Sequence, residues 1–426
     1  MRYLIIAIVF LLGLSGMVFS QPAQSGLRDI YIRGLTAYNE ADYEGFLAAM
    51  QEVAVLRPAQ WSVRYNVAAG LALTGDAEGA MEQLEAMGAG GLYVNIPAES
   101  DFDSLHDHPR YDALLATMDG LLVPSGESAL VHEFDIVGLM PEGLAVDEAT
   151  GTMFISSIRE GRVWRVGEDG GLEDFVLPDA HEGIGGLFGM AVDNERGILW
   201  VTSSTPGQYI GPHREASPLS ALFGFDLATG AVRHYFPLEG ERHFLGEVLI
   251  GPDGGIYASD SLDPVIYRVS DDLSALEPYF VADQYTNLQG FDFASDGRLY
   301  IADYVHGIGL ADVTTGTLAP LVSEEGWSLI GVDGMFYVDG ALVVIRNGVW
   351  PHAIMRHELA DDGTTIVSTR VLASQHPLWD EPTLGQIVDG QLIYSATSGW
   401  PSFLDDGTVA EGAELAPIRI MSIAID

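Results

Sequence analysis

Oxygen-bearing side chains recur at one point of a repeated β pattern in this chain. Glu142, Glu247, Gln289 and Asp333 each stand at the start of a short β run, next to a glycine. Ca²⁺ in proteins takes about six to eight oxygen ligands from carboxylates, carbonyls and water. Three carboxylates and an amide therefore predict part of the shell of a divalent cation. Ca²⁺ is the expected ion, and another divalent cation would accept the same donors.

A second set of polar and aromatic side chains comes directly after the second β run of the hairpins. Since the strands of a hairpin run in opposite directions, residues before the first strand and after the second share one face. Gln386 is expected on that face too, at the leading end of the last repeat, whereas Asp260 and Asp303 are expected to hydrogen-bond the loops that follow them. The predicted substrate rim on this face consists of His306, Asn347, Trp350, His352 and Trp400.

The elements that must position these residues are hairpins of two short β runs joined by Asp-Gly or Asn-containing turns. Short strands that repeat at such spacing are typical of β-propeller blades. We predict a six-bladed β-propeller over residues 131–426, in which the strand Val131–Val137 pairs with the last blade and closes the ring. The six hairpins are Leu144–Ser157, Met190–Ser203, Val248–Asp260, Gly290–Asp303, Met335–Arg346 and Ile387–Thr397.

The pattern before the propeller is helical. Apolar residues recur at helical spacing over residues 25–120, and Asp42, Glu44 and Gly45 return as Asp76, Glu78 and Gly79. This offset of 34 residues is the tetratricopeptide period, so the segment resembles a small all-α tetratricopeptide-like domain that could bind a protein partner. A linker rich in Pro, Ser and Gly is expected at 121–130. Residues 1–20 resemble a cleaved signal peptide, which predicts an exported, periplasmic or secreted protein; an uncleaved anchor is the alternative.

The composition excludes several classes of function. The chain has 61 acidic and 19 basic residues, a net charge of −42, and every basic residue is Arg. Such an acidic protein is not expected to bind nucleic acid or an anionic membrane, and the absence of Lys excludes a Schiff base. The absence of Cys excludes disulfides and thiolate catalysis. No segment after the signal peptide is expected to span a membrane.

Four of the hairpin motifs resemble the senescence-marker-protein/gluconolactonase family of regucalcin-like propellers. They are PEGLAVDEATGTMFIS at 141–156, GEVLIGPDGGIYASDS at 246–261, LQGFDFASDGRLYIADY at 288–304 and GVDGMFYVDGALVVIRNG at 331–348. The resemblance implies a central Ca²⁺ held by Glu142, Gln289 and Asp333. It departs in the third blade, where Gly246 stands in place of the usual Asn and Glu247 follows it. The second blade has Phe188-Gly189 instead of the His-Gly pair of paraoxonases, and the Arg and Asn of sugar lactonases are missing.

Three hypotheses about function follow. The first is a calcium-dependent lactone or ester hydrolase in which Asp333 or Glu247 acts as the general base on water. It would act on a small molecule in the propeller channel. The second is a non-catalytic binding or scaffold protein that uses the helical repeats for a protein partner. The third is a lyase with His306 or His352 as the base. No serine-hydrolase elbow is present.

Overall fold

The computed structural model describes residues 22–57, 60–214, 220–240 and 243–426. The predicted signal peptide lies outside these described residues. The chain divides into two compact units. One contains the residues up to Val123 together with Gly326–Ser328, and the other contains Pro124–Glu325 and Leu329–Asp426.

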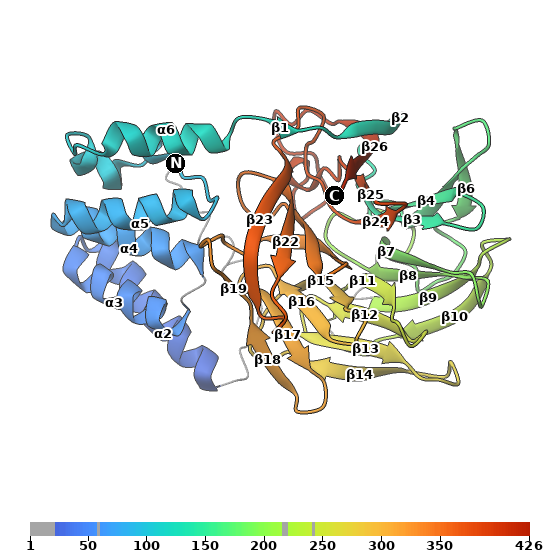
Figure 1. Ribbon diagram of the computed structural model, residues 1–426. Coiled ribbons are helices and arrows are strands. Elements are labelled where there is room, and N and C mark those ends of the chain that lie inside the picture. The colour runs from blue at the N-terminus through green and yellow to red at the C-terminus, as the bar shows by residue number, and fades with distance from the viewer. Residues whose placement is uncertain (1–21, 58–59, 215–219, 241–242) are drawn as a thin grey trace. The chain divides into compact units, whose positions relative to one another are not determined.

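The first unit is helical. Its elements are α2 (Pro22–Asn39), α3 (Tyr43–Leu56), α4 (Trp61–Thr74), α5 (Ala77–Ala89), η1 (Ile96–Ala98), η2 (Ser100–Leu105) and α6 (Tyr111–Leu121), where η denotes a 3₁₀ helix (Figure 1).

The repeat at 34 residues has a physical cause in this unit. Asp42 and Asp76 are the N-caps of α3 and α5, and each carboxylate accepts the backbone N–H of the glycine three residues later at 2.9 Å. A side chain at that glycine would clash with the capping carboxylate, since a Cβ on Gly45 would lie 2.3 Å from Asp42 Oδ2. The Asp-x-Glu-Gly repeat is therefore a helix-start signal. The tetratricopeptide assignment itself stays a prediction.

The second unit is a six-bladed β-propeller, as predicted. Each sheet forms one blade, and the blades follow one another along the chain (Figure 1). Blades 1 and 2 are β3 (Pro141–Asp147), β4 (Thr152–Ser157), β5 (Arg162–Val166) and β6 (Leu172–Val176), then β7 (Gly186–Asp193), β8 (Ile198–Ser204), β9 (Ser220–Asp226) and β10 (Val232–Pro237). Blades 3 and 4 are β11 (Leu245–Ile250), β12 (Ile256–Asp260), β13 (Val265–Val269) and β14 (Leu276–Val281), then β15 (Leu288–Phe293), β16 (Leu299–Asp303), β17 (Gly307–Asp312) and β18 (Thr317–Pro320).

The last two blades recruit strands from elsewhere in the sequence. Blade 5 has β20 (Val332–Val338), β21 (Ala341–Arg346), β22 (Ala353–Leu359) and β23 (Thr365–Ser374), extended by β1 (Ser125–Gly126) and β19 (Val322–Ser323). Blade 6 has β24 (Gly385–Val388), β25 (Gln391–Ser395) and β26 (Pro417–Ala424), and its outer strand is β2 (Ala129–Val137), which pairs antiparallel with β26. The predicted closing strand is thus confirmed.

The first strands of the six blades form the inner ring. Each lies beside the next in the order β3, β7, β11, β15, β20 and β24, and β24 lies beside β3 again. The other strands of each blade lead outward, and apolar side chains fill the space between neighbouring blades. Burying a large apolar side chain contributes about 1.5–3 kcal/mol, so these interfaces hold the ring together without disulfides.

A β-bulge recurs in the inner strand of the first five blades. In β3, Pro141 pairs with Ser157 and Leu144 with Ile155, so two residues of β3 face one of β4. The same shift occurs in β7, β11, β15 and β20. The bulge pairs are Glu142-Gly143, Phe188-Gly189, Gly246-Glu247, Gln289-Gly290 and Asp333-Gly334.

The bulge explains the glycine that stands second in the pairs of blades 1, 2, 4 and 5. Gly246, first in the pair of blade 3, differs, since a Cβ there would meet only the Ser261 hydroxyl, at 3.4 Å. A Cβ on Gly143 would lie 2.0 Å from the Phe188 carbonyl oxygen of blade 2, and one on Gly290 would lie 2.4 Å from the Asp333 carbonyl oxygen of blade 5. Neighbouring inner strands approach too closely there for any side chain. Bulges re-aim the adjacent side chain, and here they set the positions of the acidic residues.

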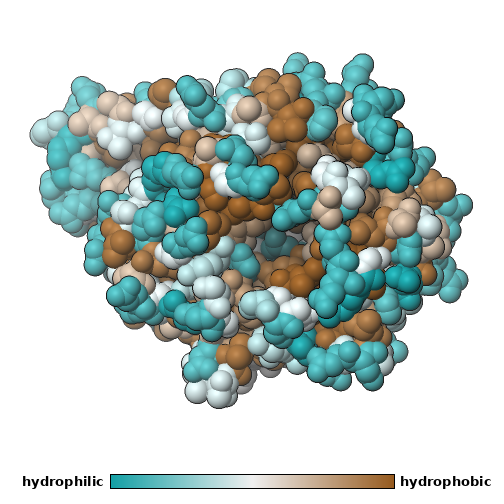
Figure 2. Space-filling view, turned by 45° about the vertical axis from the view of Figure 1, so that its right-hand side comes forward, coloured by the Kyte–Doolittle hydropathy of each residue, from teal (hydrophilic) through white to brown (hydrophobic). Residues whose placement is uncertain are grey.

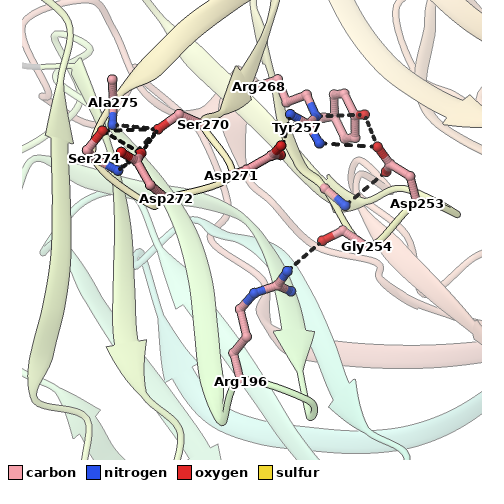
Figure 3. Close-up of polar contacts among 11 residues, drawn as sticks. Arg196, Asp253, Gly254, Tyr257, Arg268, Ser270, Asp271, Asp272, Ser274 and Ala275 are labelled. Atoms are coloured by element: carbon pink, nitrogen blue, oxygen red, sulfur yellow. Dashed lines mark hydrogen bonds and ion pairs between the residues drawn. The ribbon is translucent and has the colours of Figure 1, made fainter.

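The turn end of the hairpins carries acidic residues of a different kind. In blade 3, Asp253 Oδ2 accepts the Tyr257 hydroxyl at 2.9 Å and Arg268 Nη2 at 3.3 Å (Figure 3). Its Oδ1 accepts the Gly255 backbone N–H at 2.9 Å. Arg196 of blade 2 donates to the Gly254 carbonyl at 3.0 Å. These contacts close the β11–β12 turn and tie it to the neighbouring blade.

Figure 2 shows a face on which hydrophilic residues predominate at the outline and hydrophobic residues are interspersed. In the part of the chain that the structure describes, no helix is both long and apolar enough to cross a membrane.

Candidate central acidic site

Four carboxylates are buried at the centre of the inner ring. Glu142, Asp333 and Glu381 are 6%, 7% and 9% exposed. Glu247 is half-buried as a residue, but its Oε2 atom is buried and has no hydrogen-bond partner. Glu142, Asp333 and Glu247 stand on the recurrent bulges, at the start of inner strands, which is the end of the strand that the sequence predicts.

The pKa values of these carboxylates indicate that they lie close enough to repel one another. Burial raises the pKa of Glu142 well above its ordinary value, and the charges of Asp333 and Glu381 raise it further. Burial, then Asp333, then Asp292 raise the pKa of Glu247. Asp333 therefore lies where it interacts with acidic groups of blades 1, 3 and 6. No cationic side chain is among the main influences on the pKa of these groups.

Glu381 was not expected at the site. Burial, with repulsion from Asp333 and Asp380, raises the pKa of Glu381 to about 8. Its Oε2 accepts the Ser398 hydroxyl at 3.2 Å, and Thr383 two residues later donates its hydroxyl to the Glu142 carbonyl. Blade 6 has no bulge in its short first strand, so its contribution to the centre comes from the segment before β24.

The prediction for Gln386 was wrong. Its side-chain amide accepts the Val146 backbone N–H at 2.7 Å and donates to the Val146 carbonyl at 3.3 Å. Val146 lies near the far end of β3 from Glu142, so Gln386 ties blade 6 to blade 1 away from the carboxylates. The error came from aligning the start of β24 with the starts of the longer inner strands. The Glu-Pro pair before β24 was the available signal for Glu381.

Asn347 connects three blades beside these carboxylates. Its Nδ2 donates to Asp333 Oδ2 at 2.6 Å and to the Pro382 carbonyl at 3.0 Å, and its Oδ1 accepts the Tyr304 hydroxyl at 2.7 Å. Burial raises the pKa of Asp333 to about 6, against the Asn347 hydrogen bond, which lowers it. Burial and then the charges of Asp333, Glu381 and Glu142 raise the pKa of Tyr304, so it stays a phenol and donates.

An apolar cluster lies on the Glu142 side of the site. Trp400 Nε1 donates to Glu142 Oε2 at 3.0 Å, and the Trp400 ring stacks on Phe188 with 6.4 Å between centroids. Phe188 also packs edge-on against Phe244 at 4.9 Å. Phe188 occupies the bulge of blade 2, the one bulge pair with a large apolar residue. The cluster continues through Met140, Ile158, Phe403 and Leu415.

The remaining rim residues are less directly connected to the carboxylates. His306 Nδ1 contacts Asp303 Oδ1 at 2.8 Å, and its ring stacks on Tyr285. Burial lowers the pKa of His352 to about 4, so it is neutral at pH 7. Trp350 is 54% exposed and stacks on His352 with 4.6 Å between centroids. Their contact with a substrate stays a prediction.

Asp260 and Asp303 organise loops, as expected. Asp260 accepts the backbone N–H groups of three loop residues and contacts His243 Nδ1 at 2.7 Å. Asp303 accepts backbone N–H groups on both of its oxygens. Gln289 donates to Asn287 Oδ1 at 2.7 Å, and its role as a metal ligand stays a prediction.

The donor chemistry of the centre fits a hard divalent cation. Four buried carboxylates that repel one another carry a charge that a cation or protons must neutralise. The buried Glu247 Oε2, which has no partner, is an acceptor of the kind that such an ion would use. Within the described residues, no three Asp, Glu or His side chains are gathered closely enough to hold a metal by themselves. A bound ion would therefore need amide, carbonyl or water oxygens in addition.

A small cavity adjoins this centre. It has room for about one water molecule, and its lining includes Asp380, Ser398 and Met140. It therefore offers a place for water next to the acidic segment of blade 6, on the side of the apolar cluster.

No protein-family model and no curated protein matches the chain. Among solved structures, the PQQ-bound aldose sugar dehydrogenase from Streptomyces coelicolor aligns with 71% of this chain and 99% of its own, at 16% identity and a TM-score of 0.48. A gluconolactonase from Xanthomonas campestris aligns with 71% of this chain and 97% of its own, at 16% identity and a TM-score of 0.44.

A third similar structure is the virginiamycin B lyase from Staphylococcus aureus, which aligns with 71% of this chain and all of its own, at 12% identity and a TM-score of 0.43. A gluconolactonase is thus among the proteins whose structures this chain resembles, as the hairpin motifs predict. At these values the comparisons do not identify a reaction, and the fold assignment rests on the sheet topology.

Proposed function

We propose that this protein is an exported, divalent-cation-dependent hydrolase of lactones or esters. The observation that carries the proposal is the set of four buried carboxylates at the ring centre, one of which, Glu247, has a buried oxygen without a partner. Such a set is destabilising unless it binds a cation or protons, and proteins retain costly buried charge chiefly at functional sites.

The residues that would hold the cation are Glu142, Glu247, Gln289 and Asp333, to which the structure adds Glu381 as a candidate. When bound, Ca²⁺ would polarise the substrate carbonyl and stabilise negative charge that develops on its oxygen. Trp400 donates to one oxygen of Glu142 and so fixes the orientation of that carboxylate.

Glu247 is the better of the two candidate general bases. Asp333 Oδ2 already accepts a hydrogen bond from Asn347, whereas Glu247 Oε2 has free lone pairs and can accept a proton from an attacking water. The backbone N–H of Phe291 in the next blade opposes burial and lowers the pKa of Glu247, which keeps part of its basicity available as a carboxylate.

The test is calorimetric titration of Ca²⁺ into EDTA-stripped mature protein, beside the double variant Glu142→Gln, Asp333→Asn. We expect stoichiometric binding by the wild type and none by the variant. A panel of lactones and aryl esters, assayed with and without Ca²⁺, then tests hydrolysis. If the wild type binds no divalent cation, the proposal is wrong.

A second candidate function is a non-catalytic binding protein whose central cation only stabilises the ring. The closure of the centre favours it, since the carboxylates are buried and the cavity beside them has room for about one water. In that case Ca²⁺ would bind and raise the melting temperature without hydrolysis of any substrate in the panel. The helical unit would then be the place to seek a protein partner.

A further inference from the structure

We infer that Asn347 is a positioning residue that sets the arrangement of the central carboxylates for cation binding. The inference rests on the proposed function, because it assigns a role at the same site. Asn347 was expected at the substrate rim, but the residue is only 6% exposed and the three hydrogen bonds of its amide go to the protein.

The three hydrogen bonds fix the amide in one orientation. An Asn side chain has two N–H donors and one carbonyl acceptor, and here both donors point at acceptors, Asp333 Oδ2 and the Pro382 carbonyl. A flipped amide would set its oxygen against both of these oxygens. The Tyr304 hydroxyl donates to the amide oxygen at 2.7 Å and supports the same orientation.

The position of Asn347 is itself held by backbone contacts. Its N–H donates to the Gly331 carbonyl at 3.1 Å, just before β20, and the N–H of Gly348 donates to the same oxygen at 3.0 Å. A Cβ on Gly348 would lie 2.4 Å from the Tyr304 ring, so this glycine lets Tyr304 lie against the loop. The amide is therefore supported from blade 4 and from both ends of the blade 5 hairpin.

This placement gives Asn347 control over two carboxylates from different blades. It holds one oxygen of Asp333 and leaves the other for a ligand. It also holds the carbonyl of Pro382, the residue directly after Glu381, and so fixes the backbone that presents that carboxylate. Partners of this kind, which orient metal ligands without touching the metal, typically change metal affinity about 10- to 100-fold when they are removed.

An Asp at this position could not do the same, although it has the same size. An ionised Asp would place an oxygen without a hydrogen against Asp333 Oδ2 and the Pro382 carbonyl. Both contacts would become repulsive, and another negative charge would join four that already repel one another. The amide is therefore the group that this arrangement requires.

The experiment compares the full-length mature wild type with Asn347→Ala by Ca²⁺ calorimetry and by Tb³⁺ luminescence. Tb³⁺ binds at Ca²⁺ sites, nearby aromatic groups such as Tyr304 and Trp400 sensitise it, and its lifetimes in H₂O and D₂O report the number of bound waters. We expect the Ca²⁺ Kd to rise about 10- to 100-fold and the Tb³⁺ lifetime in H₂O to shorten as water replaces a displaced carboxylate oxygen.

Two further variants separate positioning from general stability. Tyr304→Phe removes one of the three hydrogen bonds and should raise the Ca²⁺ Kd by about two- to tenfold. This variant tests the same role if Asn347→Ala folds poorly. Gln386→Ala is the control, because its amide also links two blades, through the Val146 backbone N–H at 2.7 Å, at the far end of β3 from Glu142. It should lower the melting temperature and leave the Kd unchanged.

The outcomes are distinct. If the wild type binds neither ion, the proposed function fails and the inference fails with it. If the wild type binds Ca²⁺ and Asn347→Ala binds it with the same Kd and the same lifetimes, the proposed function stands and the positioning role is wrong. If only the melting temperature of Asn347→Ala falls, Asn347 merely holds a loop.

Discussion

The pKa values of carboxylates shift in opposite directions in two regions of the same propeller, the turn end of blade 3 and the ring centre. Although burial raises the pKa of Asp253, the Gly255 N–H, the Tyr257 hydroxyl and Arg268 outweigh it, and the pKa is lowered. Burial and mutual repulsion raise the pKa of Glu142, Glu247 and Glu381. The difference lies in the balance of partners: Asp253 has an Arg and donors that outweigh burial, whereas the hydrogen bonds to Glu142, Glu247 and Glu381 do not outweigh burial and mutual repulsion.

This contrast indicates which acidic residues serve the fold and which serve a site. A paired carboxylate stabilises the folded protein when it is charged, so its charge needs no further explanation. A cluster of buried carboxylates costs stability when it is charged, and its retention indicates a use. The following predictions test that difference, and the largest expected effect comes first.

The largest effect is expected for Glu247→Gln on the proposed hydrolysis. The amide keeps the size of the side chain but cannot accept a proton from water, so kcat should fall about 10²- to 10⁴-fold. Steady-state kinetics on the best substrate of the lactone and ester panel would measure this. Asp333→Asn serves as the comparison. A fall in kcat for Asp333→Asn alone would assign the base to Asp333.

The next effect is the stabilisation of the protein by Ca²⁺. A ligand that binds only the folded state at about 1,000 times its Kd adds about 4 kcal/mol to the free energy of unfolding. Thermal unfolding of EDTA-stripped protein, with and without Ca²⁺, measures it. Glu142→Gln should reduce the increment, and Asp253→Asn should leave it unchanged. An equal reduction in both variants would contradict the contrast between the two regions.

An effect of pH is expected next in the metal-free protein. One pKa unit is worth about 1.4 kcal/mol, and coupled groups share protons, so the total is less than the sum over the separate groups. The folded pKa values of Asp333, about 6, and Glu381, about 8, are raised. The folded state therefore binds more protons than the unfolded state in this range, and stability should fall as pH rises from about 5 to 8.

The matched variant for this pH effect is Glu381→Gln. It removes one titrating group from the centre, so it should flatten the fall in stability and make the metal-free protein more stable at about pH 8. Denaturant unfolding at several pH values would show this. If the free energy of unfolding of the metal-free wild type instead rises over this pH range, the pKa values of the central carboxylates are not raised.

The sequence contained most of the fold and part of the site. Alternating β runs with turn signals predicted all six blades, since each hairpin is a local pattern. The start of a β run beside a glycine predicted the places of Glu142, Glu247 and Asp333, and the structure shows that a bulge stands at each of them. Glu381 was missed because blade 6 has no bulge and its acidic residue comes from an irregular segment.

The hydrogen bonds of Asn347 were also beyond prediction. They join residues of blades 4, 5 and 6, and their geometry depends on how these blades pack. The hairpin argument correctly put Asn347 on the same face as Asp333. It could not distinguish a side chain that points to a substrate from one that points to its neighbour in the site.

The smallest effect is expected at the turn end of blade 3, for Arg268→Met. The variant keeps an unbranched apolar side chain about as long as the aliphatic part of Arg, and it removes contacts to Asp253 at 3.3 Å and Asp271 at 2.9 Å, whose side chains are 49% and 87% exposed. Exposed ion pairs contribute about 0.2–1 kcal/mol, so the free energy of unfolding should fall by about that amount at pH 7 and by less in high salt. Because the folded pKa of Asp253 is lowered, the difference from wild type should vanish as acid protonates it, the reverse of the pH dependence at the centre. Urea unfolding of both proteins at low and high salt measures it. A loss well above 1 kcal/mol would mean that this paired carboxylate is as critical to the fold as the central ones are to the site.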